Sequence, residues 1–268
     1  MTTKLRSSGA RYFSRRAFPT LENLPAPEID RFEPEAVRFS ARAWTMKAEQ
    51  EHRSAAVFAE AVSLLVDTGA PLDVVSALSR VVSDEVSHAE LCTRMARVFG
   101  AENPVLTPLP RTPLAPEARR ARALQLLLVE GAIGETISCA LFNAGRHVTR
   151  EPLSRAALAR ILRDEVGHAR VCWEALGVLG REPDGATLAS FQEIARNALG
   201  TIEQSQMAPV LARLKRGDPF DPAWGELGVL PPEKRVEAFY GAIEKRVVPG
   251  LTSLGLDGEA AWRDRYRA

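Results

Sequence analysis

One stretch of 13 residues occurs twice in this chain of 268 residues, and it constrains the fold more than any other feature. The sequence RVVSDEVSHAELC at residues 80–92 returns as RILRDEVGHARVC at residues 160–172. Each copy contains the motif Glu-x-x-His, as Glu85 with His88 and as Glu165 with His168. On a helix, residues three apart share one face about one turn from each other, so both side chains of a motif can bind the same metal ion.

The faces that carry these four residues are otherwise apolar. At steps of three and four along the two helices, the other positions are Val75, Leu78, Val82, Cys92, Met95 and Phe99, then Leu158, Ile161, Cys172 and Leu179. A carboxylate buried alone costs several kcal/mol or takes up a proton. The pattern therefore predicts a divalent cation between the motifs. The alternative is a surface helix with an accidental Glu-x-x-His, which two copies with matched flanks disfavour.

Composition excludes several classes of partner. The chain has 35 basic and 34 acidic residues, a net charge of +1, so we expect no nucleic-acid partner and no membrane surface. Three cysteines without a disulfide spacing favour the reducing cytoplasm. No apolar run approaches the ~18–20 residues of a membrane span. Residues 14–18 resemble a twin-arginine export motif, but a polar, proline-containing segment follows, so we predict no export signal.

The helix periodicity predicts an all-α fold with long helices at 34–67, 71–99, 116–147 and 152–179, and no strand pattern competes. Residues 101–115 contain four prolines and are predicted to be extended. At ~3.1 Å per residue these residues could reach ~45 Å. A helix of about 28 residues is ~42 Å long, so this linker could run the length of a bundle. Short, long and short connections predict a four-helix bundle with a crossover between its second and third helices.

The remaining sequence is assigned to two further regions. Residues 1–33 are rich in Arg and Pro, and we expect an irregular arm before a bundle that spans 34–180. Residues 181–268 are expected to be a helical appendage without a metal-binding constellation, which covers the bundle, shapes a substrate entrance or forms a subunit contact. Within it we predict helices at 186–207, with 209–216 continuing after a kink, at 233–248 up to a break at Pro249, and at 258–267, and a loop at 217–232.

Single glutamates in the first and third helices could complete the site. Of the glutamates in 34–67, only Glu51 lies among apolar residues on one helix face. The third helix offers Glu130 and Glu135, which are five residues apart and so about 140° apart around the helix. We favour Glu135, because Gly131, Gly134 and Ser138 surround it and would leave room for an open site. Glu130 remains an alternative, since its own face is also apolar.

This arrangement resembles the di-iron carboxylate branch of the ferritin-like superfamily, over residues 34–179. In that family, one Glu from each of the first and third helices joins a Glu-x-x-His from each of the other two. The resemblance implies a metal site of Glu51, Glu85, His88, Glu135, Glu165 and His168. It also implies that Asp84 and Asp164 accept the ring N–H of a ligand histidine and fix its tautomer.

Charge and ligand type indicate the metal. Four carboxylates balance two divalent cations, and a carboxylate-rich site with one imidazole per ion suits iron, or alternatively manganese. The only tyrosines, Tyr12, Tyr240 and Tyr266, lie outside the four helices, which argues against storage of a tyrosyl radical.

The function expected from this resemblance is an O2-activating oxidoreductase, an oxygenase or oxidase. It would act on a small organic substrate, receive electrons from an external donor protein, and be a monomer or homodimer in the cytoplasm. Two alternatives stay open. One is an iron-binding ferroxidase or a peroxide-detoxifying protein of the ferritin-like type. The other is a non-catalytic ferritin-like scaffold with structural metal.

Overall fold

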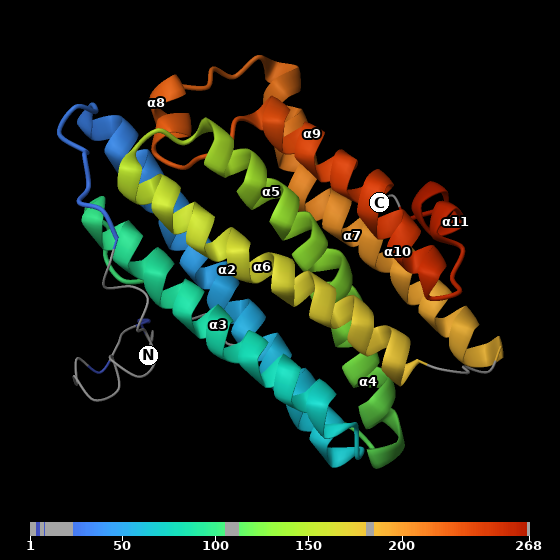
Figure 1. Ribbon diagram of the computed structural model, residues 1–268. Coiled ribbons are helices and arrows are strands. Elements are labelled where there is room, and N and C mark those ends of the chain that lie inside the picture. Colours follow the sequence, from blue (N-terminus) through green and yellow to red (C-terminus); the bar gives the residue numbers. More distant parts are fainter. Residues whose placement is uncertain (1–3, 6–7, 9–23, 105–112, 181–184, 267–268) are drawn as a thin grey trace.

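The computed structural model describes residues 4–5, 8, 24–104, 113–180 and 185–266 (Figure 1). All regular structure in this part of the chain is helical, which confirms the all-α prediction. Four long helical segments form the bundle. They are α2 (Pro34–Asp67), α3 (Leu72–Val98), a composite third helix of η1 (Pro116–Ala118), α4 (Arg119–Leu126), η2 (Leu127–Gly134) and α5 (Glu135–Val148), and α6 (Pro152–Leu179).

Local sequence explains where these helices begin and end. Proline occupies the first turn of α2, η1 and α6, where its missing N–H leaves no helix hydrogen bond unmade. The buried Glu151 caps α6 by accepting hydrogen bonds from the backbone N–H groups of Leu153 and Ser154. After α2 and α3 the chain turns at Gly69 and Gly100, whose φ angles of 70° and 87° favour glycine. The predicted bounds of α2 and α6 are confirmed, and α3 is shorter than predicted by a single residue at each end.

Two contacts fix the directions of the helices. Arg119 at the start of α4 pairs with Asp67 at the end of α2, with 3.1 Å between Nη1 and Oδ2. The guanidinium of Arg120 donates to the carbonyl of Leu179 at the end of α6 over 2.7 Å. The third helix therefore begins at the end of the bundle where α3 also begins, and α3 and α5 run in the same direction (Figure 1). The predicted crossover follows from this order, although residues 105–112 of the connection lie outside the described part of the chain.

The third helix contains a feature that periodicity did not predict. Residues 127–134 form a π-helix, η2, between α4 and α5. A π turn adds a residue to the turn, so every side chain after it is rotated relative to a regular α-helix. Glu135 is the first residue after this segment.

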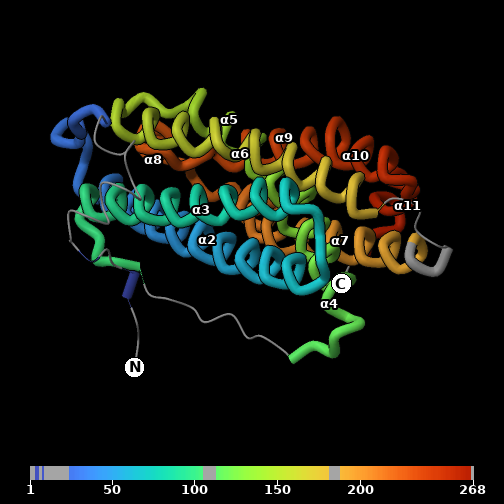
Figure 2. The backbone as a smooth tube through the Cα atoms, turned by 60° about the horizontal axis from the view of Figure 1, so that its bottom comes forward, coloured from blue at the N-terminus to red at the C-terminus, as the bar shows by residue number. Residues whose placement is uncertain are grey.

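Helices of the appendage lie along α5, on the side of the bundle away from α3 (Figures 1 and 2). They are α7 (Gly185–Arg216), α8 (Pro222–Glu226), α9 (Pro232–Ala242), η3 (Ile243–Val247), α10 (Val248–Ser253) and α11 (Gly258–Arg263). Residues 209–216 continue α7, as expected. Two predictions here were wrong in detail. Helix α8 lies within the predicted loop, and the helix does not break at Pro249. The π turn η3 directly before α10 displaces the carbonyl groups that the ring of Pro249 would otherwise meet.

Close contacts join the appendage to the bundle. A Cβ atom on Gly250 of α10 would lie 2.8 Å from the ring of Trp173 on α6, so only glycine permits this approach. At the other end, the buried Trp44 of α2 donates its indole N–H to the carbonyl of Leu227 over 3.2 Å. Gly228, with a φ of 99°, lies directly against the same ring. The appendage thus packs against α6 at one end of the bundle and against α2 at the other.

By length and composition, the helix Pro116–Val148 could also cross a membrane, which corrects the prediction that no apolar run approaches the length of a span. Half of its most apolar window is buried inside the structure, however, and the buried core helix of a soluble protein passes the same test.

Candidate metal centre

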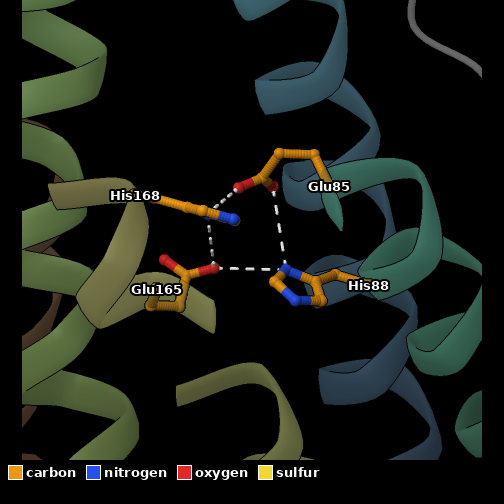
Figure 3. Close-up of side chains that lie close together, drawn as sticks. All are labelled: Glu85, His88, Glu165 and His168. Atoms are coloured by element: carbon orange, nitrogen blue, oxygen red, sulfur yellow. Dashed lines mark ion pairs between the residues drawn. The ribbon is translucent and has the colours of Figure 1, made fainter. Parts of the chain in front are cut away.

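Four side chains from the two repeats converge between α3 and α6 (Figure 3). Glu85 and His88 come from α3, and Glu165 and His168 come from α6. All four are buried, and one potential ligand atom from each lies within 4.8 Å of the others. The repeat therefore does what its spacing predicted: each motif presents both of its side chains on one helix face, and the two faces meet. This cluster could hold a metal ion.

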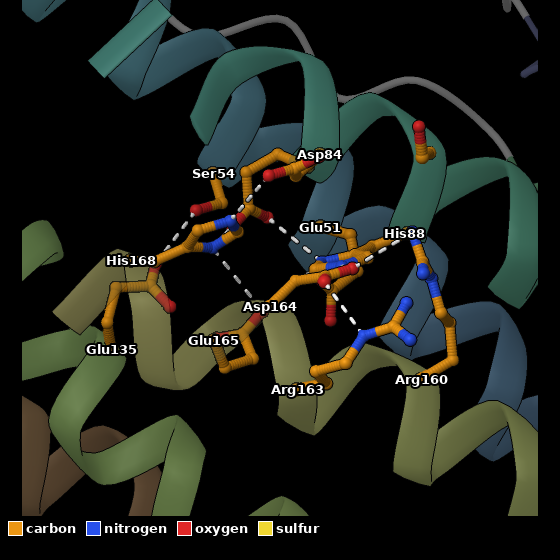
Figure 4. Close-up of polar contacts among 12 residues, drawn as sticks. Glu51, Ser54, Asp84, His88, Glu135, Arg160, Arg163, Asp164, Glu165 and His168 are labelled. Carbon is orange, nitrogen blue, oxygen red and sulfur yellow. Dashed lines mark hydrogen bonds and ion pairs between the residues drawn. The ribbon is translucent and has the colours of Figure 1, made fainter. Parts of the chain in front are cut away.

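The aspartates that precede the two glutamates bind the histidines of the opposite helix. His88 Nε2 lies 3.3 Å from Asp164 Oδ2, and His168 Nε2 lies 3.3 Å from Asp84 Oδ2 (Figure 4). The histidine ring N–H donates and the carboxylate accepts, which fixes the tautomer with a free Nδ1. The sequence predicted the aspartate–histidine contact, and the structure adds that each aspartate serves the histidine of the other repeat.

The atoms that face the centre of the cluster lack hydrogen-bond partners. Among the described residues, these atoms include Nδ1 of both histidines and Oε1 of Glu85 and Glu165. His168 Nδ1 is 2.9 Å from Glu85 Oε1, and His88 Nδ1 is 3.2 Å from Glu165 Oε1. The atoms are close but are not oriented as hydrogen bonds. Buried polar atoms without partners need an explanation, and a set of two imidazole nitrogens and two carboxylate oxygens fits a divalent cation.

Glu51 and Glu135 lie at the edges of this cluster, and both are buried. Glu51 Oε2 is 3.4 Å from His88 Nδ1. Glu135 accepts a hydrogen bond from Ser54 Oγ over 3.3 Å and contacts Glu165 on the adjacent helix (Figure 4). The six residues named from the sequence are thus brought to one place, although Ser54 was not anticipated. A serine one turn after Glu51 on the same helix was the available signal.

The alternative glutamate of the third helix points elsewhere. The side chain of Glu130 is 41% exposed, and its Oε1 lies 3.6 Å from the guanidinium of Arg53. Glu135, the first residue after the π-helix Leu127–Gly134, is instead buried, where it accepts a hydrogen bond from Ser54 and lies beside Glu165. The expectation that the nearby glycines leave open space is corrected at Gly131. A Cβ there would lie 2.6 Å from Cys172 Sγ, so this glycine allows close packing of α6.

Burial and mutual repulsion raise the pKa of three carboxyl groups of the cluster. Burial raises the pKa of Glu165 to about 7 and, with the nearby Glu135, raises the pKa of Glu85 to about 8. The pKa of Glu135 is also raised by burial and by Glu165. Burial alone would lower the pKa of His168, but the hydrogen bond to Asp84 and the nearby Glu85 carboxylate, 2.9 Å from Nδ1, raise it to about 9. Without a cation, protons must therefore neutralise these carboxylates.

No protein-family model, no curated protein and no solved structure matches this chain. The interpretation of the site therefore rests on its geometry.

A lysine near the cluster was missed from the sequence. Lys47 lies one helical turn before Glu51, and burial lowers its pKa to about 8. Its ammonium group donates to the carbonyl of Gly228 over 3.4 Å and lies 5.0 Å from the ring centre of Trp44. Lys47 therefore links the metal-site helix to the loop after α8. Its position between the apolar Trp44 and Ala48 was the signal in the sequence.

Proposed function

We propose that this chain is a ferritin-like protein that binds two iron ions, with manganese as the alternative metal. The ligands would be Glu51, Glu85, His88, Glu135, Glu165 and His168. The observation that supports this most strongly is the group of inward-facing ligand atoms from both Glu-x-x-His motifs, which lie within 4.8 Å of one another. Two repeats with matched donors favour a pair of ions over a single one.

The residues of the chain have distinct tasks in this proposal. Glu85 and Glu165 each lie within 4.0 Å of both histidine Nδ1 atoms, so each would help to hold metal beside either histidine. Glu51 lies beside His88, and Glu135 lies beside Glu165. Asp84 and Asp164 hold the imidazole rings with Nδ1 directed at the centre. When bound, such a pair of ions would supply electrons to O2 and open coordination positions for it.

We further propose that the protein is an O2-activating oxidoreductase, an oxygenase or oxidase, that acts on a small organic substrate. Two imidazole-containing motifs favour retention of both ions as a cofactor over transfer of iron to a mineral. The appendage α7–α11 covers the α5 side of the bundle, which would hinder assembly of a ferritin-type cage (Figure 1). The proposal includes an external electron donor protein, a monomeric or homodimeric state and a cytoplasmic location.

The test combines metal analysis with O2 uptake. Protein purified after iron supplementation should contain about two iron ions per chain and consume O2 when reduced. Glu165→Ala should lose metal and O2 uptake, whereas Glu130→Ala, which changes an exposed glutamate, should retain both. Protein without iron or manganese under any loading condition would refute the metal site. Many tens of irons per chain in a large hollow particle would indicate an iron store, and metal-loaded protein without O2 uptake would indicate a scaffold.

A further inference from the structure

The two repeats match at the cluster but differ in what surrounds the aspartates. Asp164 is held by two arginines of its own helix. Arg160 Nη2 lies 3.3 Å from Oδ2, and Arg163 Nε lies 3.5 Å from Oδ1 (Figure 4). As a result, the Asp164 side chain is only 16% exposed.

Asp84 has no such support. The residues at the corresponding positions of the first repeat are Arg80 and Ser83. Within the described part of the chain, neither makes an ion pair or side-chain hydrogen bond with Asp84, whose side chain is 42% exposed. Among the described residues, the polar partner of Asp84 is His168 alone. One aspartate–histidine pair is therefore braced by the protein, and the other is open to solvent.

We infer that the two metal positions are unequal, and that the ion beside His88 binds more tightly and enters first because Arg160 and Arg163 brace Asp164. This inference rests on the proposed two-ion site. Arg160 and Arg163 act as positioning residues, because they reach the ion only through Asp164 and the His88 ring.

The physical reason is the orientation of the imidazole. A ligand histidine binds metal best when its other ring nitrogen is held by a fixed acceptor, and loss of such an acceptor costs 10–100-fold in metal affinity. Asp164 is fixed at both oxygens, whereas Asp84 can turn toward water and release His168. The positive charge of Arg163 opposes this effect weakly, because its side chain is 63% exposed and the charge is screened. Arg160 is only 21% exposed, but its charge is offset by the Asp164 carboxylate that it contacts.

The carboxylates around the two histidines also support this inference. His88 Nδ1 has Glu51, Glu85 and Glu165 within 4.0 Å. His168 Nδ1 has Glu85 and Glu165 within that distance. Glu135 also acts on His168 but makes no ion pair with it within 4.0 Å. Carboxylates therefore lie closer around the His88 nitrogen, which also belongs to the better-held imidazole.

The experiment is a titration of the metal-free full chain with Mn(II), in which the electron paramagnetic resonance signal of free Mn(II) reports binding. The wild type should bind two ions with affinities that differ by less than the roughly 10–100-fold cost of losing an acceptor, because Asp84 still accepts from His168. His168→Ala should keep the tighter position and His88→Ala the weaker one. Arg160→Ala should weaken the tighter position several-fold and leave the other unchanged, and Arg160→Lys should restore part of the loss.

The repeat offers matched controls. Arg80→Ala changes the equivalent arginine of α3 and should alter neither affinity, whereas Ser83→Arg, which introduces the missing arginine, should tighten the weaker position. Thermal unfolding of each metal-free variant shows whether it folds. Two ions bound with equal affinity would overturn this inference but leave the proposed function intact, and absence of binding would overturn both. Equal weakening of both positions by Arg160→Ala would show a general structural role and also overturn the inference.

Discussion

The metal-free protein should lose stability as pH rises from about 5 to 9. Glu85 and Glu165 have pKa values raised by burial from 4.5 to about 8 and about 7. Between pH 4.5 and these values, the unfolded chain releases the protons and the folded chain keeps them, so unfolding becomes more favourable as pH rises. His168, with its pKa raised from 6.5 to about 9, acts in the same direction. Its protonation stabilises the folded state below pH 6.5, and this contribution is lost as pH passes 9.

The size of the effect follows from the shifts. At about 1.4 kcal/mol per pKa unit, the shift of Glu85 corresponds to roughly 4–5 kcal/mol and that of Glu165 to roughly 3 kcal/mol. The two carboxyl groups belong to one cluster and titrate together, so their effects do not add. We expect a total decrease of roughly 3–5 kcal/mol in the free energy of unfolding, a large part of the 5–15 kcal/mol typical of a folded protein.

The assay is urea unfolding of protein treated with a chelator, at steps between pH 5 and 9. The double variant Glu85→Gln with Glu165→Gln keeps the shape of the side chains but removes both titrations, so its stability should vary much less with pH. Glu130→Gln is the control, since Glu130 is 41% exposed and should leave the wild-type slope unchanged. A wild-type stability that stays constant or increases over this range would refute the reasoning, as would an equal slope in the double variant.

Two further predictions concern the third helix, and Gly177 of α6 provides a control for the first. Gly131→Ala should destabilise the protein by about 1–3 kcal/mol in urea unfolding, because its Cβ would meet Cys172 Sγ at 2.6 Å. When Cys172→Ala is combined with Gly131→Ala, the loss of stability caused by Gly131→Ala should be smaller by about 1 kcal/mol or more. Additive effects of the two substitutions on the free energy of unfolding would contradict the contact. Gly177→Ala, with no atom near its Cβ, should stabilise by up to about 1 kcal/mol. Glu135→Gln should reduce the number of bound metal ions per chain and Glu130→Gln should not; the reverse result in metal analysis would exchange their roles.

Much of the fold could be predicted because local chemistry determines it. Pro34 and Pro152 begin helices, and Gly69 and Gly100 follow their ends, so α2, α3 and α6 were placed within a residue. The π turns η2 and η3 were not predictable in this way, since a wider turn depends on packing against neighbouring helices and leaves no periodic signal. The continuation through Pro249 was missed for the same reason.

The candidate site, like the fold, could be predicted only where local helix geometry determines it. Spacing and burial pattern identified the two Glu-x-x-His motifs, because helix geometry alone puts each pair on one face. The choice between Glu130 and Glu135 stayed open because both lie among apolar neighbours in sequence. In the structure, Arg53 pairs with Glu130, and Ser54 hydrogen-bonds to Glu135. Both partners come from α2, so sequence separation hid the contacts that distinguish the two glutamates.

Each repeat supplies the aspartate that holds the histidine of the other repeat, so the two copies of the motif depend on each other. Asp84 orients the histidine of the second repeat, and Asp164 orients that of the first. Neither Glu-x-x-His motif is therefore complete on its own helix, and the two metal positions that we propose would form only when α3 and α6 pack together. Buried carboxylates destabilise the fold unless protons or cations neutralise them. Metal binding and the packing of α3 on α6 would therefore be thermodynamically coupled. Metal should then protect α3 and α6 from local opening together, even though they are separated by more than 50 residues of chain.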